Sequence, residues 1–143
     1  MTLKEQLHRA IEIALTAHEG QFDTHNGRPY IEHPYRVMSG GHMLQEKIAG
    51  MLHDVVEDSE WTLEQLTAEG FSQEIVVAVD ALTRREGEPY EESIRRVKAD
   101  ALATRVKLLD LTDNMDIRRW EKVTEKDLER LQKYLKAYKQ LTE

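Results

Sequence analysis

Apolar residues recur every three or four positions along most of the chain, which is the spacing of amphipathic helices. At the N-terminus, Thr2 and Glu5 form a capping-box pattern, and the apolar stripe that follows continues to His18 before Gly20 ends the helix. No segment alternates apolar and polar residues convincingly, as a half-buried strand would, so we predict an all-α protein. The predicted helices span 3–18, 33–39, 45–58, 62–70 and 72–82, followed by two helices within 90–118 and a last helix from residue 124.

Two segments of this pattern, one loop and the last helix, are described in more detail. Residues 21–30, QFDTHNGRPY, form the longest predicted loop near any candidate motif, because Asn26-Gly27 favours a turn and Pro29 keeps the preceding residue extended. The last helix has an apolar stripe and a charged face, and we expect the stripe to close the bundle. Its predicted members are Leu128, Leu131, Leu135 and Tyr138.

Composition narrows the class of protein. With 143 residues, the chain is long enough for one domain with a substantial core, and residues 1–143 are predicted to form a single domain. The 20 Lys and Arg against 27 Asp and Glu give a net charge of −7, which argues against binding nucleic acid or an anionic membrane through a general basic surface. An anionic ligand must therefore be attracted locally.

Cysteine is absent, which excludes disulfide scaffolds, thiolate zinc sites and cysteine nucleophiles. This composition favours a cytoplasmic location. The N-terminus is polar from the fourth residue, and no window approaches the apolar length of a membrane span, so we expect no targeting segment and no membrane partner.

The central segment AGMLHDVVEDS carries the densest candidate chemistry. In a helix, His53 and Glu57 share one face, as do Asp54 and Asp58, because each pair is four residues apart. Three carboxylates beside an apolar face repel one another. They either point to solvent or surround a cation that neutralises them.

Two further residues support a polar site. His33 stands directly before Pro34, and Asp110 interrupts the apolar run VKLLDLTDNM. A buried carboxylate needs a partner, because an unpaired one costs several kcal/mol. That partner is either a lysine, for which Lys107 is the candidate, or a metal ion.

The succession AHEGQ, GRPYIEHP, MLHDVVEDSEWT and RVKLLDLTDNM resembles the HD-domain superfamily, and specifically the small stand-alone form of the alarmone hydrolase domain of RelA/SpoT homologues. The resemblance covers about residues 10–120. It implies one compact HD-domain bundle of about seven or eight helices. It also implies a metal-dependent phosphohydrolase that removes the 3′-diphosphate from (p)ppGpp as pyrophosphate.

The same resemblance implies roles for individual residues. Glu57 and Asp58 match the catalytic acidic pair, which orients and deprotonates the attacking water. The mixed nitrogen and oxygen ligand set suits Mn²⁺ or a related divalent ion better than a closed zinc site. The implied metal ligands are His33, His53, Asp54 and Asp110.

Substrate contacts are implied at Tyr30 and Asn114, although a core ring and a helix-surface amide are the structural alternatives. The sequence departs from the family at Phe22–Asn26, where an Arg-Lys pair usually engages the nucleotide. We expect His25 and Arg28 to substitute as donors, with a solvated loop as the alternative for His25. Asp113 is an additional acid in this chain, and we expect it to face water.

Three functions remain open at this point. The leading hypothesis is hydrolysis of (p)ppGpp or a related alarmone nucleotide. The alternatives are an HD phosphohydrolase acting on another nucleotide, such as an adenosine alarmone or a nucleoside phosphate, and a non-catalytic nucleotide-sensing module. Alarmone synthesis is not expected, because the hydrolase-like domain occupies essentially all 143 residues. The sequence does not indicate an oligomeric state.

Overall fold

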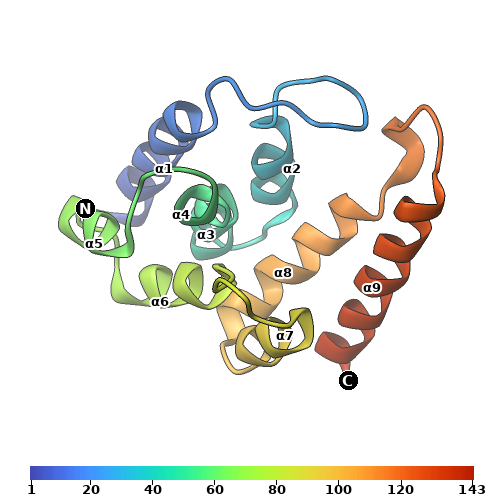
Figure 1. Cartoon of the computed structure of the whole chain (residues 1–143). Helices are drawn as coiled ribbons and strands as arrows, with labels where there is room; N and C mark the ends of the chain where they lie inside the picture. The colour runs from blue at the N-terminus through green and yellow to red at the C-terminus, as the bar shows by residue number, and fades with distance from the viewer.

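The computed structural model describes residues 1–143 and is entirely helical apart from loops and one isolated bridge between Phe22 and Pro29. It confirms the all-α prediction, with eight helices in addition to the single turn α4 (Figure 1). The elements are α1 (Leu3–Ala17), α2 (Glu32–Gly40), α3 (Leu44–Leu52), α4 (Val55–Asp58), α5 (Leu63–Glu69), α6 (Gln73–Leu82), α7 (Tyr90–Lys98), α8 (Ala101–Asn114), the 3-10 turn η1 (Ile117–Arg119) and α9 (Glu125–Thr142).

Side-chain caps set several helix starts. The predicted capping box is present at Thr2, and Thr62 and Thr124 form the same motif, in which each hydroxyl accepts from the backbone N–H three residues later. Reciprocal caps satisfy backbone donors that a helix start leaves free. Gly70 ends α5 in the left-handed conformation, with φ of 105°, as glycine does at helix C-termini.

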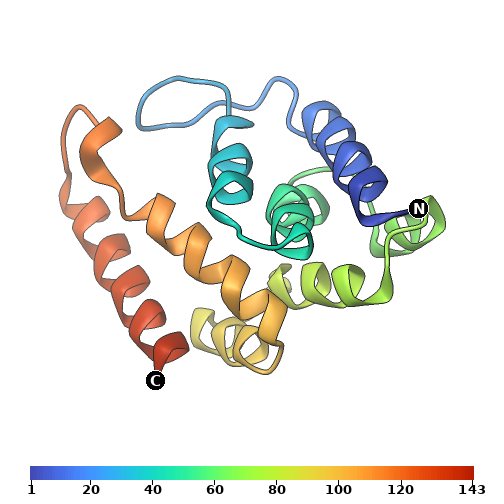
Figure 2. The ribbon, with the colours of Figure 1, turned by 180° about the vertical axis from the view of Figure 1, so that it is seen from behind.

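Helix α3 lies at the centre of the molecule. It packs against α1, α2, α6 and α8, and Figures 1 and 2 show these helices around it from opposite sides. Ile48, Ala49 and Leu52 of α3 are fully buried in one contiguous apolar core. This rigid centre holds the residues that directly follow α3, where the HD motif lies.

The predicted helix over 45–58 is wrong in one respect, because it is broken at His53-Asp54. The Gly50 carbonyl accepts from Nδ1 of His53 at 2.6 Å, and the Asp54 N–H that would continue the helix makes no such bond. Asp54 then adopts φ −107° and ψ −2°, in the sparsely occupied bridge region. A side chain that competes for a backbone carbonyl thus separates α3 from α4.

The stripe predicted for the last helix is also wrong in part. Leu128 and Leu135 are 54% and 47% exposed, while Ala137 and Leu141 are buried. Helix α9 therefore packs a face different from the one that its leucines suggest. It lies beside α8 at one edge of the molecule (Figure 1). Among all the helices, none combines the length and the apolar surface that a membrane span requires.

Candidate metal centre and active site

Four side chains converge from three parts of the fold. His33 comes from the first turn of α2, His53 and Asp54 from the break after α3, and Asp110 from α8. His33 Nε2 lies 2.8 Å from Asp110 Oδ1 and 3.8 Å from Asp54 Oδ2. His53 Nε2 lies 3.1 Å from the same Asp54 oxygen and 3.3 Å from the same Asp110 oxygen. The fold therefore brings all four predicted ligands together.

The two imidazole rings present the same nitrogen to this cluster. Nδ1 of His53 bonds to the Gly50 carbonyl, and Nδ1 of His33 lies 2.6 Å from Asp113 Oδ2. When both Nδ1 atoms donate and the rings are neutral, each Nε2 offers the cluster a lone pair that could bind a cation. Metal-ligating histidines are typically held in this way by a partner on the second nitrogen.

The donor set fits a divalent cation. His53 Nε2 is buried but makes no hydrogen bond of acceptable geometry, despite the two carboxylate oxygens near it. Neighbouring ligand atoms around one ion bound at about 2.1 Å stand about 3 Å apart, which is close to the separations in this cluster. His33, His53 and Asp54 alone form a triad that could hold a metal ion.

Burial differs across the cluster. The side chains of His33, His53 and Asp110 are 6%, 3% and 6% exposed, whereas the Asp54 side chain keeps 18% of its surface open. Solvent and ligand therefore reach the cluster from the side of Asp54. Burial alone lowers the pKa of His33, but the carboxylates of Asp110 and Asp113 outweigh this effect and raise it to about 9.

Asp110 also has the lysine partner that the sequence left as an alternative. Lys107 Nζ lies 2.9 Å from Asp110 Oδ2, on the side of the carboxylate away from the histidines. Burial opposes ionisation of Asp110, but Lys107 and the two imidazoles hold its pKa well below the usual value. The lysine alternative is therefore confirmed at Oδ2, while Oδ1 faces the two histidines.

The acidic pair Glu57 and Asp58 lies on α4, which begins directly after Asp54. The Glu57 carboxylate accepts from the Arg84 backbone N–H at 2.9 Å, which ties α4 to the loop after α6. Partial burial, together with the negative charges of Asp54 and Glu57, raises the pKa of Asp58 to about 6. A carboxylate in this range accepts a proton efficiently near neutral pH.

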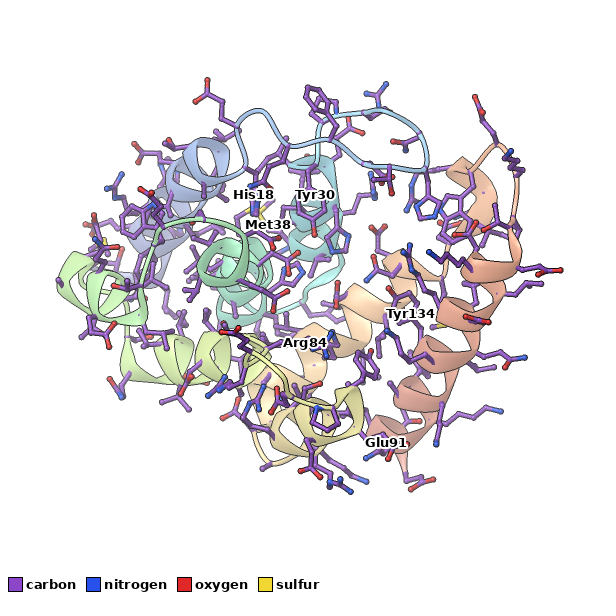
Figure 3. The ribbon with its side chains drawn as sticks, viewed as in Figure 1. His18, Tyr30, Met38, Arg84, Glu91 and Tyr134 are labelled. Carbon is purple, nitrogen blue, oxygen red and sulfur yellow. The ribbon has the colours of Figure 1, made fainter.

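Tyr30 and Asn114 both turn toward the cluster. The Tyr30 hydroxyl donates to Asp54 Oδ2 at 2.5 Å, and Asn114 Nδ2 donates to Asp110 Oδ1 at 3.2 Å. Figure 3 shows Tyr30 beside His18, and their ring centroids are 5.2 Å apart. Burial and the Asp54 charge raise the pKa of Tyr30, so its hydroxyl stays protonated as a donor.

The loop residues His25 and Arg28 are placed differently from each other. His25 Nε2 lies 3.0 Å from Asp127 Oδ1, and its ring stacks on Trp120 at 3.9 Å, so the loop is fastened to α9. Arg28 is exposed and its guanidinium pairs with Glu32. Arg28 does not reach the cluster, whereas His25 lines a cavity beside it.

That cavity has a volume of about 70 Å³ and joins the cluster to the C-terminal part of the chain. It contains all the predicted substrate contacts except Arg28. Its lining also includes two positively charged residues that we did not predict from the sequence, Arg119 and Arg130. Its lining residues are Asp23, His25, Tyr30, His33, Asp113, Asn114, Arg119, Trp120, Arg130 and Tyr134.

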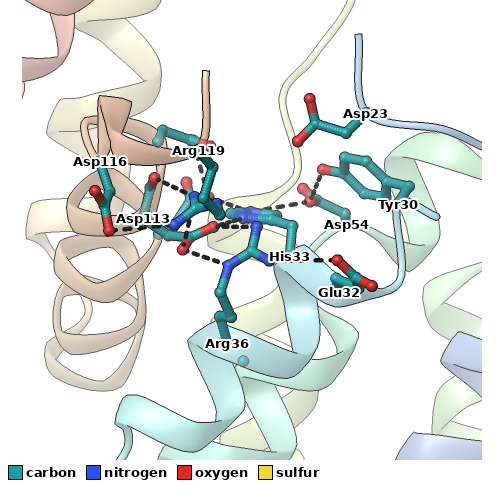
Figure 4. Close-up of polar contacts among 12 residues, drawn as sticks. Asp23, Tyr30, Glu32, His33, Arg36, Asp54, Asp113, Asp116 and Arg119 are labelled. Carbon is teal, nitrogen blue, oxygen red and sulfur yellow. Dashed lines mark hydrogen bonds and ion pairs between the residues drawn. The ribbon is translucent and has the colours of Figure 1, made fainter. Parts of the chain in front are cut away.

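The prediction that Asp113 faces water is wrong. Its side chain is only 11% exposed and contacts His33, Arg36 and Arg119, as Figure 4 shows. Burial opposes the charged form, but the hydrogen bonds and positive charges of His33 and Arg36 lower the pKa of Asp113 to about 2. The signal that could have found it is its position one turn after Asp110, which places both acids on one side of α8.

A second group of residues missed from the sequence is a basic cluster, which we define as Arg84, Lys107, Arg130 and Lys133. Lys133 Nζ lies 4.5 Å and Arg84 Cζ 5.5 Å from the Tyr90 ring centroid. Burial and the other three positive charges lower the pKa of Lys133. The four cations come from three separate segments, so their proximity could not be read from spacing.

A groove of about 650 Å³ between α7 and α9 shares Tyr90 and Lys133 with this region. None of the four candidate metal ligands lines this groove. The chemistry therefore lies at the smaller cavity beside His33, and the groove extends the surface on which a larger ligand could rest.

Comparisons with protein families and with known proteins place this chain among HD-domain proteins. A family model described as the HD domain matches residues 10–141. Guanosine-3′,5′-bis(diphosphate) 3′-pyrophosphohydrolase of Haemophilus influenzae is 38% identical over 118 residues, which are 72% of this chain and 17% of the relative. A GTP pyrophosphokinase of Streptomyces coelicolor is 35% identical over 123 residues, which are 77% of this chain and 14% of the relative. The chain thus spans less than a fifth of these curated relatives.

A solved structure shares the fold. It comes from work titled "A metazoan ortholog of SpoT hydrolyzes ppGpp and plays a role in starvation responses". The TM-score is 0.76 at 20% sequence identity, and the match covers 95% of this chain and 84% of the other. The match shows that this chain shares its all-α fold with that protein.

Proposed function

This chain belongs to the HD-domain family, and from that membership we propose that it is a metal-dependent pyrophosphohydrolase of (p)ppGpp or a related alarmone nucleotide. The observation that carries the proposal is the convergence of His33, His53, Asp54 and Asp110 next to the acidic pair on α4. The 3′-pyrophosphohydrolase relatives at 30–38% identity support the same reaction class.

The proposed reaction is hydrolysis at phosphorus. A water oxygen forms a bond to the phosphorus attached to O3′, the bond between that phosphorus and O3′ breaks, and pyrophosphate leaves while O3′ takes a proton. A divalent ion held by the four ligands would supply Lewis-acid charge and make a water more acidic. Asp58 accepts the proton of the attacking water, and Glu57, held by the Arg84 N–H, orients it.

Local positive charge supports an anionic substrate on this acidic protein. The family's Arg-Lys pair is absent from residues 22–26, but Arg119 and Arg130 line the cavity beside the cluster. Arg84 and Lys133 of the basic cluster flank Tyr90. We propose that these groups, with Asn114 and His25, contact the nucleotide and its phosphates.

Several finer assignments belong to the same proposal. The mixed imidazole and carboxylate set supports Mn²⁺ as the metal. The continuous core supports a single HD domain over residues 1–143. The absence of cysteine supports a cytoplasmic location, and the net charge of −7 supports a small-molecule partner rather than nucleic acid.

A substrate panel tests the function. Purified protein reconstituted with Mn²⁺ should release pyrophosphate from ppGpp and pppGpp, and none from GDP or GTP. Orthophosphate from nucleoside monophosphates with no pyrophosphate from ppGpp would instead identify a different HD phosphohydrolase. Cleavage confined to adenosine 3′-diphosphates would identify an adenosine alarmone as the substrate.

A variant of Glu57 distinguishes a catalytic protein from a nucleotide-sensing module. Glu57→Gln should reduce pyrophosphate release at least 100-fold while metal content stays unchanged. The matched control is Glu60→Gln, which changes an exposed acid just beyond α4 and should keep wild-type activity. Binding of ppGpp without turnover in the wild type would identify a sensing module.

A further inference from the structure

Asp113 is not one of the proposed metal ligands, but its carboxylate is hydrogen-bonded directly to one of them, His33. Asp113 Oδ2 lies 2.6 Å from His33 Nδ1, while His33 Nε2 lies 2.8 Å from Asp110 Oδ1. Asp110 and Asp113 come from successive turns of α8, so the His33 ring is held at both nitrogens by one helix. The His33 and Asp113 side chains are 6% and 11% exposed, so water competes little for this bond.

The position of Asp113 is itself held by two arginines. Arg36 Nε donates to Asp113 Oδ1 at 2.7 Å, and Arg36 Nη2 donates to Oδ2 at 3.2 Å. Arg119 Nη2 also donates to Oδ1, at 3.2 Å. Paired contacts of this kind restrict the carboxylate plane and keep one oxygen aimed at the ring.

We infer that Asp113 is a positioning residue that keeps Nδ1 of His33 protonated and Nε2 directed at the metal. This inference rests on the proposed metal site and not on the identity of the substrate. A carboxylate on the second nitrogen fixes the ring tautomer and makes the ligating nitrogen a stronger donor. His53 has a neutral partner instead, the Gly50 carbonyl, so the two histidine ligands are unequal.

Metal affinity measures this role without reference to turnover. Titration of the metal-free full chain with Mn²⁺ alone should show Asp113→Asn binding about 10- to 100-fold more weakly than wild type. The matched control is Asp116→Asn, which removes another carboxylate partner of Arg119 but no contact to His33. The control should bind Mn²⁺ within about twofold of wild type.

A spectroscopic measurement separates ring orientation from a general loss of negative charge. In the protein loaded with diamagnetic Zn²⁺, the ¹⁵N spectrum should show His33 with a protonated Nδ1 that exchanges slowly with solvent. Asp113→Asn should speed that exchange, whereas Asp116→Asn should not. The wild-type spectrum alone tests the tautomer, so the inference stays testable even if the variant does not fold.

Specific outcomes overturn the inference. The inference is contradicted if Asp113→Asn binds Mn²⁺ within threefold of wild type. It is also contradicted if Asp116→Asn loses as much Mn²⁺ affinity as Asp113→Asn, or if Nδ1 of His33 is unprotonated in the wild type. His33→Gln distinguishes this failure from failure of the metal site. If His33→Gln abolishes Mn²⁺ binding and Asp113→Asn binds Mn²⁺ within threefold of wild type, only the role of Asp113 is wrong. If His33→Gln binds normally, the proposed site is wrong.

Discussion

Lys107 Nζ lies 2.9 Å from Asp110 Oδ2, while the other oxygen of the same carboxylate faces His33 and His53. The carboxylate thus joins a buried ion pair to the candidate metal centre. Removing the lysine leaves an under-compensated buried charge, and breaking such a pair from one side is strongly destabilising.

We therefore expect Lys107→Met to lower the unfolding free energy of the metal-free protein by about 3 kcal/mol. Mn²⁺ should recover part of this loss, because a cation then compensates Asp110. Urea unfolding with and without Mn²⁺ measures both effects. The matched control Lys136→Met removes an ion pair with Glu91. The two side chains are 73% and 61% exposed, so the change in stability should be much smaller than in Lys107→Met. Equal losses in the two variants would contradict this account of Asp110.

Tyr30 donates its hydroxyl to Asp54, which assigns it a role different from a plain substrate contact. Tyr30→Phe should preserve the fold, weaken Mn²⁺ binding by about tenfold and lower kcat. Calorimetric titration and steady-state kinetics measure the two changes. Tyr35→Phe, at a ring that is 58% exposed on α2, is the control and should alter neither. If KM for ppGpp rises while Mn²⁺ affinity is unchanged, Tyr30 contacts substrate instead.

Asp58 should determine the acidic limb of the pH–rate profile. Its pKa is raised to about 6 by burial and by the charges of Asp54 and Glu57, and only the deprotonated form accepts a proton. Hydrolysis should therefore fall as pH drops through about 6, with bound Mn²⁺ shifting the limb toward lower pH. Asp58→Asn should abolish the limb along with most activity, while Glu60→Gln keeps both. If the residual activity of Asp58→Asn shows the same acidic limb, the limb arises from the titration of another group.

His33 should make the stability of the metal-free protein depend on pH. Its pKa is raised to about 9 in the folded state by Asp110 and Asp113, above the value of about 6.5 in an unfolded chain. The stabilisation is therefore fully present below about pH 6.5 and is lost as pH rises through about 9.

The measurable result is a fall in Tm of the EDTA-treated protein between about pH 6.5 and about pH 9. Saturating Mn²⁺ should flatten this fall, because metal binding favours the neutral imidazole. His8→Gln, at an exposed position of α1, should follow the wild-type profile, while His33→Gln should show a shallower one. A His33→Gln profile that superimposes on wild type would show that the pH dependence arises elsewhere.

Local signals were sufficient for most of the helices. Thr2, Thr62 and Thr124 mark helix starts because each cap involves residues only three positions apart, so the pattern in the sequence is the interaction itself. The break at His53-Asp54 was missed because helical periodicity does not show that the His53 ring captures the Gly50 carbonyl. The stripe of α9 was misassigned because neighbouring helices, rather than leucine spacing alone, decide which face is covered.

The sequence by itself determined the chemistry of the site: which residues could ligate a cation, which acids could accept a proton, and that Asp110 required a partner. Only the tertiary structure decided the geometry, because His33 and Asp113 are 80 positions apart and meet through the packing of α2 against α8. The same packing turned Asp113 from an expected surface acid into a partner of a proposed metal ligand. Periodicity predicts a face, but the contacts of that face depend on the other helices of the fold.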